Sequence, residues 1–264
     1  MLGLLAGGGE LPLIFCKNAK KSGEKVITVA VRDETKAGLK KLSHKYFCFG
    51  SGELGKAIKA FKQEKVKEIC IVGKVRKKKL FTELRPDMTL FKVFVKLANK
   101  KDSTLIGGVI GEFERNGIEV LPMTRFLKDQ LAEKGILTKR KPTAKERADI
   151  KKGFGEARKL ADSDLGQTVI VENKNILARE GIDGTNAVIL LGGRLKKKNA
   201  VCVKTARTKQ DFRIDIPGIG VNTIKTLKTA GIRCLALEAG KMLIVEKEKV
   251  KREADKNGIC VIAL

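Results

Sequence analysis

The chain has 264 residues, and its 56 basic against 30 acidic residues give a formal charge of +26. The length suits two domains of ordinary size. The charge attracts polyanions such as nucleic acid, anionic lipid headgroups or phosphorylated ligands; the alternative is that the lysines only make the surface soluble. With no Trp, one Tyr, one His and six widely spaced cysteines, the composition disfavours base-stacking on aromatic rings and a zinc site.

The first 122 residues alternate short apolar runs with helical patterns. Strands are expected at residues 2–6, 25–31, 46–49, 68–72 and 118–121, and helices at 11–21, 54–65, 90–99 and 103–116. Strands that alternate with helices predict a parallel sheet with helical crossovers. The N-terminal run lacks a basic start and is interrupted by Glu10 and Pro12, so it does not read as a signal peptide. No apolar stretch has the length of a membrane span. Several cysteines lie within apolar runs, which fits a reducing cytoplasm, so we expect a cytoplasmic protein.

The second half mixes its elements less regularly. The charged stretch 123–147, punctuated by Pro122 and Pro142, predicts a domain boundary near residue 135. We expect a Rossmann-like, nucleotide- or substrate-binding domain over 1–135 and a smaller, mixed α/β domain over 136–264. Strands are expected at 168–172, 175–178, 200–204, 212–216, 234–237, 241–245 and 260–263, and helices at 144–161, 183–191, 221–230 and 246–257.

Glycine-containing turns follow expected strands of the first half. Ligands bind open α/β sheets at the carboxyl ends of strands, next to helix N-termini, and glycines there allow close backbone approach to a phosphate. A plain tight turn is the alternative, and the pattern is neither a dinucleotide-binding nor a Walker A sequence. The residues that we assign to substrate binding here are Gly7, Gly8, Gly9, Leu11, Pro12, Gly73 and Lys74.

The segment from Asp211 to Gly220 is the most informative part of the sequence. Its alternation predicts a strand with Asp211, Arg213 and Asp215 on one face, about 7 Å apart. Carboxylates bind hard cations such as Mg²⁺, and arginine binds phosphate through paired hydrogen bonds. This face therefore suits a divalent cation and a phosphate, and an exposed strand with a surface ion pair is the alternative.

The same segment is also similar to a helix-hairpin-helix DNA-binding motif. Its glycine turn is followed by an expected helix and by Ala230-Gly-Ile232, and the net charge would suit DNA. That motif requires a helix before the hairpin, whereas a strand is expected here. A DNA-binding protein is therefore kept as an alternative, and no nucleic-acid partner is expected.

The sequence Asp183-Gly-Thr-Asn186 opens an expected helix. Thr185 and Asn186 are residue types that cap helices, which is a purely structural interpretation. The functional interpretation is a second polar loop that faces the same ligand, to which Glu180 and Asp183 add carboxylates.

Taken together, these motifs resemble the LpxI family of UDP-2,3-diacylglucosamine pyrophosphatases. The residues that carry the resemblance are Leu4-Leu-Ala-Gly-Gly-Gly-Glu-Leu-Pro12, Gly52-Glu53, Gly55-Lys56, Asp164-Leu-Gly-Gln167, Asp183-Gly-Thr185, Lys204, Gln210-Asp-x-Arg-x-Asp-x-Pro-x-Ile-Gly220 and Glu238-Ala-Gly240. They keep their order through both halves of the chain. One departure is Asn186, which stands where the family usually has an aspartate.

The resemblance implies a Rossmann-like N-terminal domain and a catalytic C-terminal α/β domain, with a lipid-bearing sugar phosphate bound between them. It implies Mg²⁺-dependent hydrolysis of UDP-2,3-diacylglucosamine to UMP and 2,3-diacylglucosamine 1-phosphate (lipid X) in lipid A biosynthesis. Attack is implied at the phosphorus attached to the sugar. Asp215 matches the family's essential aspartate.

The resemblance also implies roles for individual residues. Asp215 and Arg213 are expected to be catalytic, and Asp215, Asp211 and Asp183 to bind Mg²⁺. Further substrate-binding residues are expected to be Thr185, Asn186, Lys204 and Gln210. We expect peripheral association with the anionic inner leaflet of the inner membrane and allow for a homodimer. A Rossmann-like enzyme that acts on another nucleotide-sugar is the remaining alternative.

Overall fold

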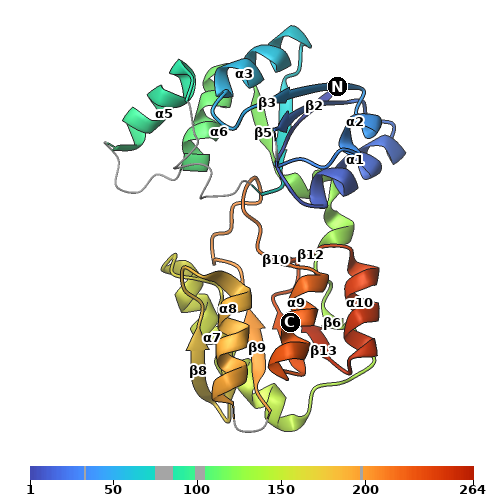
Figure 1. The fold of residues 1–264 in the computed structure, drawn as a ribbon, viewed down its shortest axis with the longest axis vertical. Helices are drawn as coiled ribbons and strands as arrows, with labels where there is room; N and C mark the ends of the chain where they lie inside the picture. Colours follow the sequence, from blue (N-terminus) through green and yellow to red (C-terminus); the bar gives the residue numbers. More distant parts are fainter. Residues whose placement is uncertain (33, 75–85, 99–104, 197–198) are drawn as a thin grey trace. The chain divides into compact units, whose positions relative to one another are not determined.

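The computed structural model describes residues 1–32, 34–74, 86–98, 105–196 and 199–264. The chain forms two compact units (Figure 1). Unit 1 comprises Met1–Lys128 together with Phe212–Ile214, and unit 2 comprises Asp129–Asp211 together with Asp215–Leu264. A short segment from the second half of the chain thus belongs to the first unit, and no sequence pattern indicated this.

Unit 1 is built on a parallel sheet with the strand order β3-β2-β1-β4-β5. Its strands are β1 (Leu2–Ala6), β2 (Val26–Val31), β3 (Lys45–Phe49), β4 (Glu68–Val72) and β5 (Glu119–Leu121). Its helices are α1 (Leu11–Lys21), α2 (Leu39–Leu42), α3 (Leu54–Gln63), α5 (Met88–Ala98) and α6 (Leu105–Arg115). This strand order is that of a Rossmann-like half, so the expected parallel α/β fold is confirmed.

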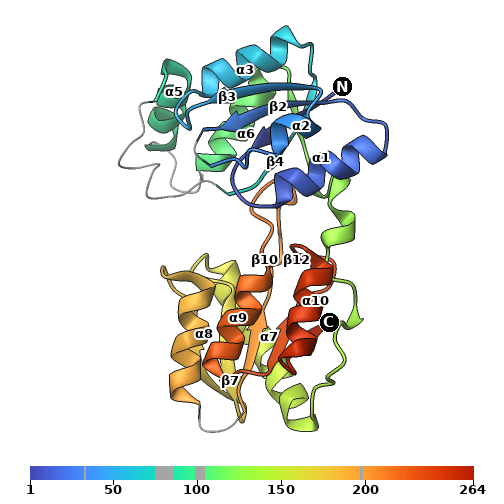
Figure 2. The ribbon, with the colours of Figure 1, turned by 45° about the vertical axis from the view of Figure 1, so that its right-hand side comes forward.

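Helices cover both faces of this sheet. Figures 1 and 2 show α1 and α2 on one side and α3 and α6 on the other. The rings of Phe61 in α3 and Phe113 in α6 meet edge to face at 6.1 Å between centroids, and both side chains are fully buried. On the α1 side, Phe15 packs against Phe126 at 5.4 Å. The first pair therefore joins α3 to α6, and the second joins α1 to the segment that follows β5.

Unit 2 is built on a mixed sheet with the strand order β6-β13-β11-β9-β7-β8, in which β13, β11 and β9 are parallel. Its strands are β6 (Gly135–Ile136), β7 (Thr168–Glu172), β8 (Asn175–Arg179), β9 (Val201–Lys204), β11 (Cys234–Leu237) and β13 (Cys260–Ala263), and β10 (Gly218–Ile219) pairs separately with β12 (Leu243–Ile244). Its helices are α7 (Ala144–Asp162), α8 (Gly184–Leu195), α9 (Val221–Ala230) and α10 (Lys247–Lys256). The expected mixed α/β character is confirmed.

Successive residues of β9 pack into different core layers of unit 2. Val201 and Val203 pack with Ile150 and Ala157 of α7, whereas Cys202 packs in the cluster formed by α8, α9 and α10. Because side chains of a strand alternate between faces, α7 covers one face of the sheet and the other three helices cover the opposite face.

A buried carboxylate ties the β7–β8 hairpin to α7. Asn173 and Lys174 at the hairpin turn have φ angles of 51° and 61°, as a type I′ turn requires. Their backbone N–H groups donate to the carboxylate of Asp149 at 3.1 and 2.5 Å. The turn and the helix therefore hold each other in place.

The strand expected over 212–216 is wrong. These residues form turns and an irregular segment, and the next strand is the short β10. Phe212 and Ile214 belong to unit 1 and make their contacts there instead of with a neighbouring strand. The carbonyl oxygen of Phe212 accepts a hydrogen bond from the N–H of Met123 at 2.9 Å, and Ile214 packs against the unit 1 core.

Candidate functional site

Two loops meet at the carboxyl edge of the unit 1 sheet. Gly8, after β1, and Lys74, after β4, pair through backbone hydrogen bonds of 2.7 and 3.0 Å. A Cβ atom on Gly7 would lie 2.7 Å from the carbonyl oxygen of Lys74. Gly73 has a φ of 104°, and a Cβ atom there would lie 2.8 Å from Gly7. These glycines therefore serve the contact between the two loops.

Gly9 differs from its neighbours because open space surrounds the position of its missing Cβ atom, and its φ is 95°. It lies beside the start of α1, where the N-cap residue Glu10 makes no side-chain cap and Pro12 occupies the first turn. Leu11 is half-buried and Lys74 is exposed. Uncapped N–H groups at a helix start favour an anion, so this part of unit 1 suits a phosphate.

A buried ion pair lies at one edge of the unit 2 sheet. Lys204 ends β9, and its Nζ lies 3.6 Å from Oε2 of Glu180, with side chains that are 6% and 10% exposed. The Lys204 ammonium donates to the hydroxyl oxygens of Thr185 at 2.7 Å and Thr168 at 3.2 Å. Thr185 in turn donates to Oε1 of Glu180 at 2.7 Å. Lys204 therefore fixes Thr185, in the first turn of α8, at the sheet edge.

The Glu180 carboxylate stays charged in this buried place. Burial raises its pKa, but the charge of Lys204 and hydrogen bonds from Thr168, Thr185 and the Gln167 N–H outweigh burial, and the net pKa is lowered from 4.5. A buried charge persists only where it is paired and hydrogen-bonded. The cluster is thus a pre-organised set of charges at the start of α8.

The sequence positions of this cluster were foreseen only in part. Lys204 was expected from the family resemblance, and Glu180 from its carboxylate before the helix expected at 183–191. Thr168 was missed, because its position opposite Lys204 follows from the antiparallel register of β7 and β9. No local pattern around Thr168 encodes that register.

The loop after β9 is anchored on both sides. The N–H of Ala206 donates to Glu238, after β11, at 3.0 Å, and Thr208 donates through its N–H and hydroxyl to Asp162 at 2.7 Å each. Arg207 forms an ion pair with Asp164. The loop is therefore held at the carboxyl edge of the three parallel strands, where α/β sheets bind ligands.

Asp215 occupies an unusual backbone conformation in the continuation of this loop. Its φ is 48°, a left-handed value that residues other than glycine seldom adopt. The side-chain amide of Gln210 donates to the carbonyl oxygen of Asp215 at 3.2 Å, and the Asp215 side chain is exposed. Strained residues with exposed functional groups are found at active sites.

Arg213 does not share a strand face with the two aspartates, so that expectation is wrong. Without a strand at 212–216, the alternation of faces does not exist. Arg213 belongs to unit 1, where its guanidinium pairs with Glu114 of α6 at 3.1 Å, whereas Asp211 and Asp215 belong to unit 2.

The start of α8 corrects the capping interpretation. The N-cap is Asp183, which makes no side-chain cap, so neither Thr185 nor Asn186 caps the helix. Asp183 and Asn186 are exposed. Thr185 instead serves the Lys204–Glu180 cluster.

The oxygen donors decide whether this part of the chain suits Mg²⁺. In the described part of the chain, no group of three or more His, Cys, Asp or Glu side chains could hold a metal ion. Mg²⁺ commonly uses only one or two carboxylates together with substrate phosphates and water. The exposed Asp215 fits this second mode, and a contribution of Asp211 or Asp183 to Mg²⁺ binding stays a prediction.

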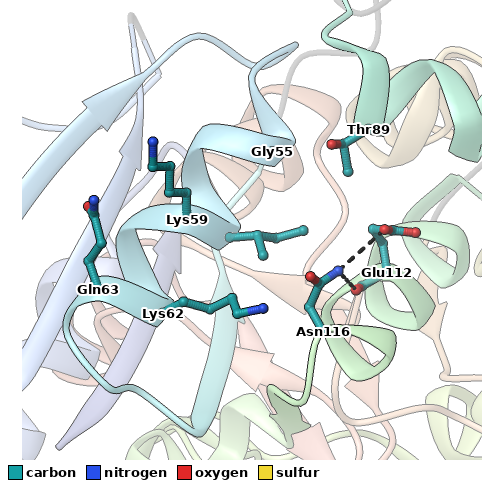
Figure 3. Close-up of a pocket in the computed structure, with 8 residues that line it drawn as sticks. Gly55, Lys59, Lys62, Gln63, Thr89, Glu112 and Asn116 are labelled. Atoms are coloured by element: carbon teal, nitrogen blue, oxygen red, sulfur yellow. Dashed lines mark hydrogen bonds between the residues drawn. The ribbon is translucent and has the colours of Figure 1, made fainter.

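A cavity of about 550 Å³ lies elsewhere in unit 1, between α3, α5 and α6 (Figure 3). Lys59 and Lys62 of α3 line one side, and Glu112 and Asn116 line the other, joined to each other by hydrogen bonds of 2.9 and 3.4 Å. None of the predicted site residues lines this cavity.

Comparisons with known proteins cover both units. The family described as LpxI N-terminal domain matches residues 1–130, and the family described as LpxI C-terminal domain matches residues 133–262. A curated relative, "UDP-2,3-diacylglucosamine pyrophosphatase LpxI" from Caulobacter vibrioides, is 31% identical over 274 aligned positions, which cover 100% of this chain and 97% of the relative.

Solved structures add no further argument. The biotin carboxylase complex from Campylobacter jejuni is 14% identical with a TM-score of 0.28, and covers 66% of this chain and 36% of its own. Glycinamide-RNase-transformylase T from Mycobacterium tuberculosis is 11% identical with a TM-score of 0.26, and covers 68% and 44%. Likeness of this degree supports no inference about ligand or activity. The two family matches and the full-length relative confirm the resemblance seen in the sequence: this chain belongs to the LpxI family.

Proposed function

We propose that this protein hydrolyses the pyrophosphate bond of UDP-2,3-diacylglucosamine in lipid A biosynthesis, releasing UMP and 2,3-diacylglucosamine 1-phosphate. The observation that carries the proposal is the match to a curated pyrophosphatase along the whole chain. The pre-organised charges of unit 2 agree with a phosphate-bearing substrate. The DNA-binding alternative is disfavoured because no helix precedes the Pro217–Gly220 turn within residues 205–216.

The chain's own groups suit this reaction. In hydrolysis, a water oxygen bonds to one phosphorus, the bridging P–O bond breaks, and the water proton leaves to solvent. The uncapped start of α8 places positive potential beside Thr185, which favours a phosphate there, whereas the charge of Lys204 is balanced by Glu180. We assign Lys204 a positioning role, because its ammonium is buried and engaged by Thr185, Thr168 and Glu180.

Asp215 is proposed as the carboxylate that acts on the reacting phosphate. Mg²⁺, when bound with the substrate, would neutralise phosphate charge and lower the pKa of a bound water. Gln210 holds the Asp215 backbone and the Asp162 and Glu238 anchors hold the loop before it. A carboxylate on an anchored loop needs little reorganisation when substrate binds. Arg213 stays a predicted catalytic residue, and its guanidinium would leave the ion pair with Glu114 to bind the phosphate.

We further propose peripheral association with an anionic cytoplasmic leaflet. In the part of the chain that the structure describes, no helix combines the length and apolar character of a membrane span. The acylated substrate resides in lipid, and the charge of +26 attracts anionic headgroups. A homodimer stays a prediction that analytical ultracentrifugation would test.

The proposal is tested by incubating the purified protein with UDP-2,3-diacylglucosamine in detergent micelles with Mg²⁺ and following UMP release by chromatography. UMP and lipid X should appear in equal amounts. Asp215→Asn, which keeps the shape and removes the charge, should lower the rate at least about 100-fold, with circular dichroism as the folding control. A protein that releases no UMP, or cleaves other nucleotide-sugars equally well, is not the proposed enzyme.

A further inference from the structure

Helix α5 of unit 1 exposes an unusual apolar stripe. Met88, Phe91 and Val95 are 71%, 51% and 48% exposed. At 100° per residue, these three positions fall within about 60° of the helix circumference. Figures 1 and 2 show α5 at the periphery of unit 1, beside α6. A large apolar side chain at a single exposed position is ordinary, but a stripe of three marks an interaction surface.

The rest of α5 explains why this stripe is not required for folding. Leu90 and Val93 are buried in the unit 1 core, and they lie roughly opposite the stripe on the helix. Lys92 and Lys96 are exposed and lie about 40° and 80° from Met88, along one margin of the stripe. The helix therefore has a core face, an apolar outer face and a basic margin, which is the pattern of helices that lie in a membrane interface.

We propose that the outer face of α5, formed by Met88, Phe91, Val95, Lys92 and Lys96, docks on the surface of an anionic lipid bilayer. This inference rests on the proposed function, because it specifies where an enzyme with a lipid substrate meets the membrane. The apolar side chains would enter the acyl boundary, and the two ammonium groups would remain at the level of the lipid phosphates.

Charge complementarity selects a bilayer over a second copy of this chain. A symmetric contact between two α5 helices would use the same patch on both copies. When the two helices are antiparallel, it places the lysines of both copies along the same edge of the contact, which costs free energy because like charges repel. Anionic headgroups neutralise the same lysines, and each lysine near such a surface strengthens binding by about fivefold.

The test is co-sedimentation of the whole protein with vesicles of equal parts phosphatidylglycerol and phosphatidylethanolamine. Phe91→Ser with Val95→Ser should weaken binding by roughly tenfold or more, and Lys92→Glu with Lys96→Glu should weaken it most at low salt. The matched control is Leu191→Ser with Leu195→Ser. These α8 side chains are 47% and 50% exposed, so the control removes similar apolar surface from another helix and should bind like wild type.

Several results would overturn the docking face. They are unchanged binding by the Phe91 and Val95 variant, an equal loss in the α8 control, or wild-type binding to phosphatidylcholine vesicles as strong as to anionic ones. A change in oligomeric state with unchanged vesicle binding would assign the stripe to a second copy. UMP release in detergent micelles is measured for every variant and should match wild type. Absence of release in all of them would refute the proposed function, while vesicle binding would still decide the docking face.

Discussion

Replacing Lys204 by Met tests whether the buried pair in unit 2 is needed for both stability and activity. The apolar stem of Lys204 is kept, but Glu180 is left charged and without its cationic partner. Breaking a buried pair by removing one partner costs about 3–5 kcal/mol. We expect the lower end, about 3 kcal/mol, because the two charged atoms lie 3.6 Å apart. This corresponds to a fall in melting temperature of about 10 °C.

The pH dependence of this loss has a defined sign. In the wild type, the pKa of Glu180 is lowered from 4.5, so its stabilisation is present above pH 4.5 and is lost as the pH falls through the lowered pKa. Without Lys204, burial should dominate and raise the Glu180 pKa above its unfolded value. The variant then regains stability as it takes up a proton on acidification. The difference between the two proteins should therefore be largest near pH 7 and shrink below it.

The double variant Lys204→Met with Glu180→Gln separates stability from function. It removes both charges, so most of the lost stability should return. UMP release should stay lowered by about 100-fold, since the Lys204 ammonium no longer holds Thr185 in place. Stability is measured by urea unfolding followed by circular dichroism. This account of the pair would be refuted if Lys204→Met lowered the free energy of unfolding by less than about 1 kcal/mol. It would also be refuted if the double variant released UMP at a near-normal rate.

Three further predictions concern the metal, the hairpin and the thiols. Activity should be lost in EDTA and return with Mg²⁺, and full turnover in chelator with no metal found by elemental analysis would contradict the proposed use of Asp215. Asp149→Ala should lower the free energy of unfolding by about 3 kcal/mol, because two charge-assisted hydrogen bonds to the β7–β8 turn are lost. Asp149→Asn should lower it less. If wild type and Asp149→Ala unfolded at the same midpoint, the proposed tie between the turn and α7 would be contradicted. One thiol should react quickly with Ellman's reagent in the native state. Cys48 is the exposed cysteine, whereas burial raises the pKa of Cys16 to about 11 and of Cys202 to about 12; Cys48→Ser should abolish the fast phase.

Local patterns predicted most of the secondary structure but misassigned the segment at 212–216. The apolar runs of β4 and β9 and the helical periodicity of α1 and α9 are contained in contiguous residues, so they could be read directly. The alternation of Phe212 and Ile214 has the same form. Its cause is contact with another part of the chain, which includes the N–H of Met123, and period-two alternation does not distinguish the two cases.

The candidate site was also predicted unevenly, for a related reason. Glycines at the ends of β1 and β4 were foreseen, but their main structural task is contact between two loops that are 60 or more residues apart, such as Gly7 with Lys74. The role of Lys204 depends on Thr168 and Thr185, which the sheet register and the start of α8 bring to it. The family resemblance implied that Lys204 binds substrate, and only the tertiary structure shows that its charge is buried and paired with Glu180.

The backbone of Asp215 offers the sharpest distinction between a structural and a chemical role. An L-residue in the left-handed region costs about 1–2 kcal/mol, and Asp tolerates it better than most. Asp215→Gly relieves this strain but loses about 0.5–1 kcal/mol of backbone entropy, so its stability should equal wild type within about 0.5 kcal/mol. Asp215→Ala should be less stable by about 1 kcal/mol, because Ala keeps the strain without a polar side chain.

Hydrolysis should be lost equally in the Gly and Ala variants, although their stabilities differ, because both lack the carboxylate. Urea unfolding and UMP release on the same preparations decide the matter. Activity that follows stability, high in Asp215→Gly and low in Asp215→Ala, would mean that the loop conformation matters and the carboxylate does not. If both variants are inactive although their stabilities differ, the carboxylate itself is needed for hydrolysis. The chain then keeps a strained aspartate here for its charge, because a side chain that lies exposed meets no packing requirement.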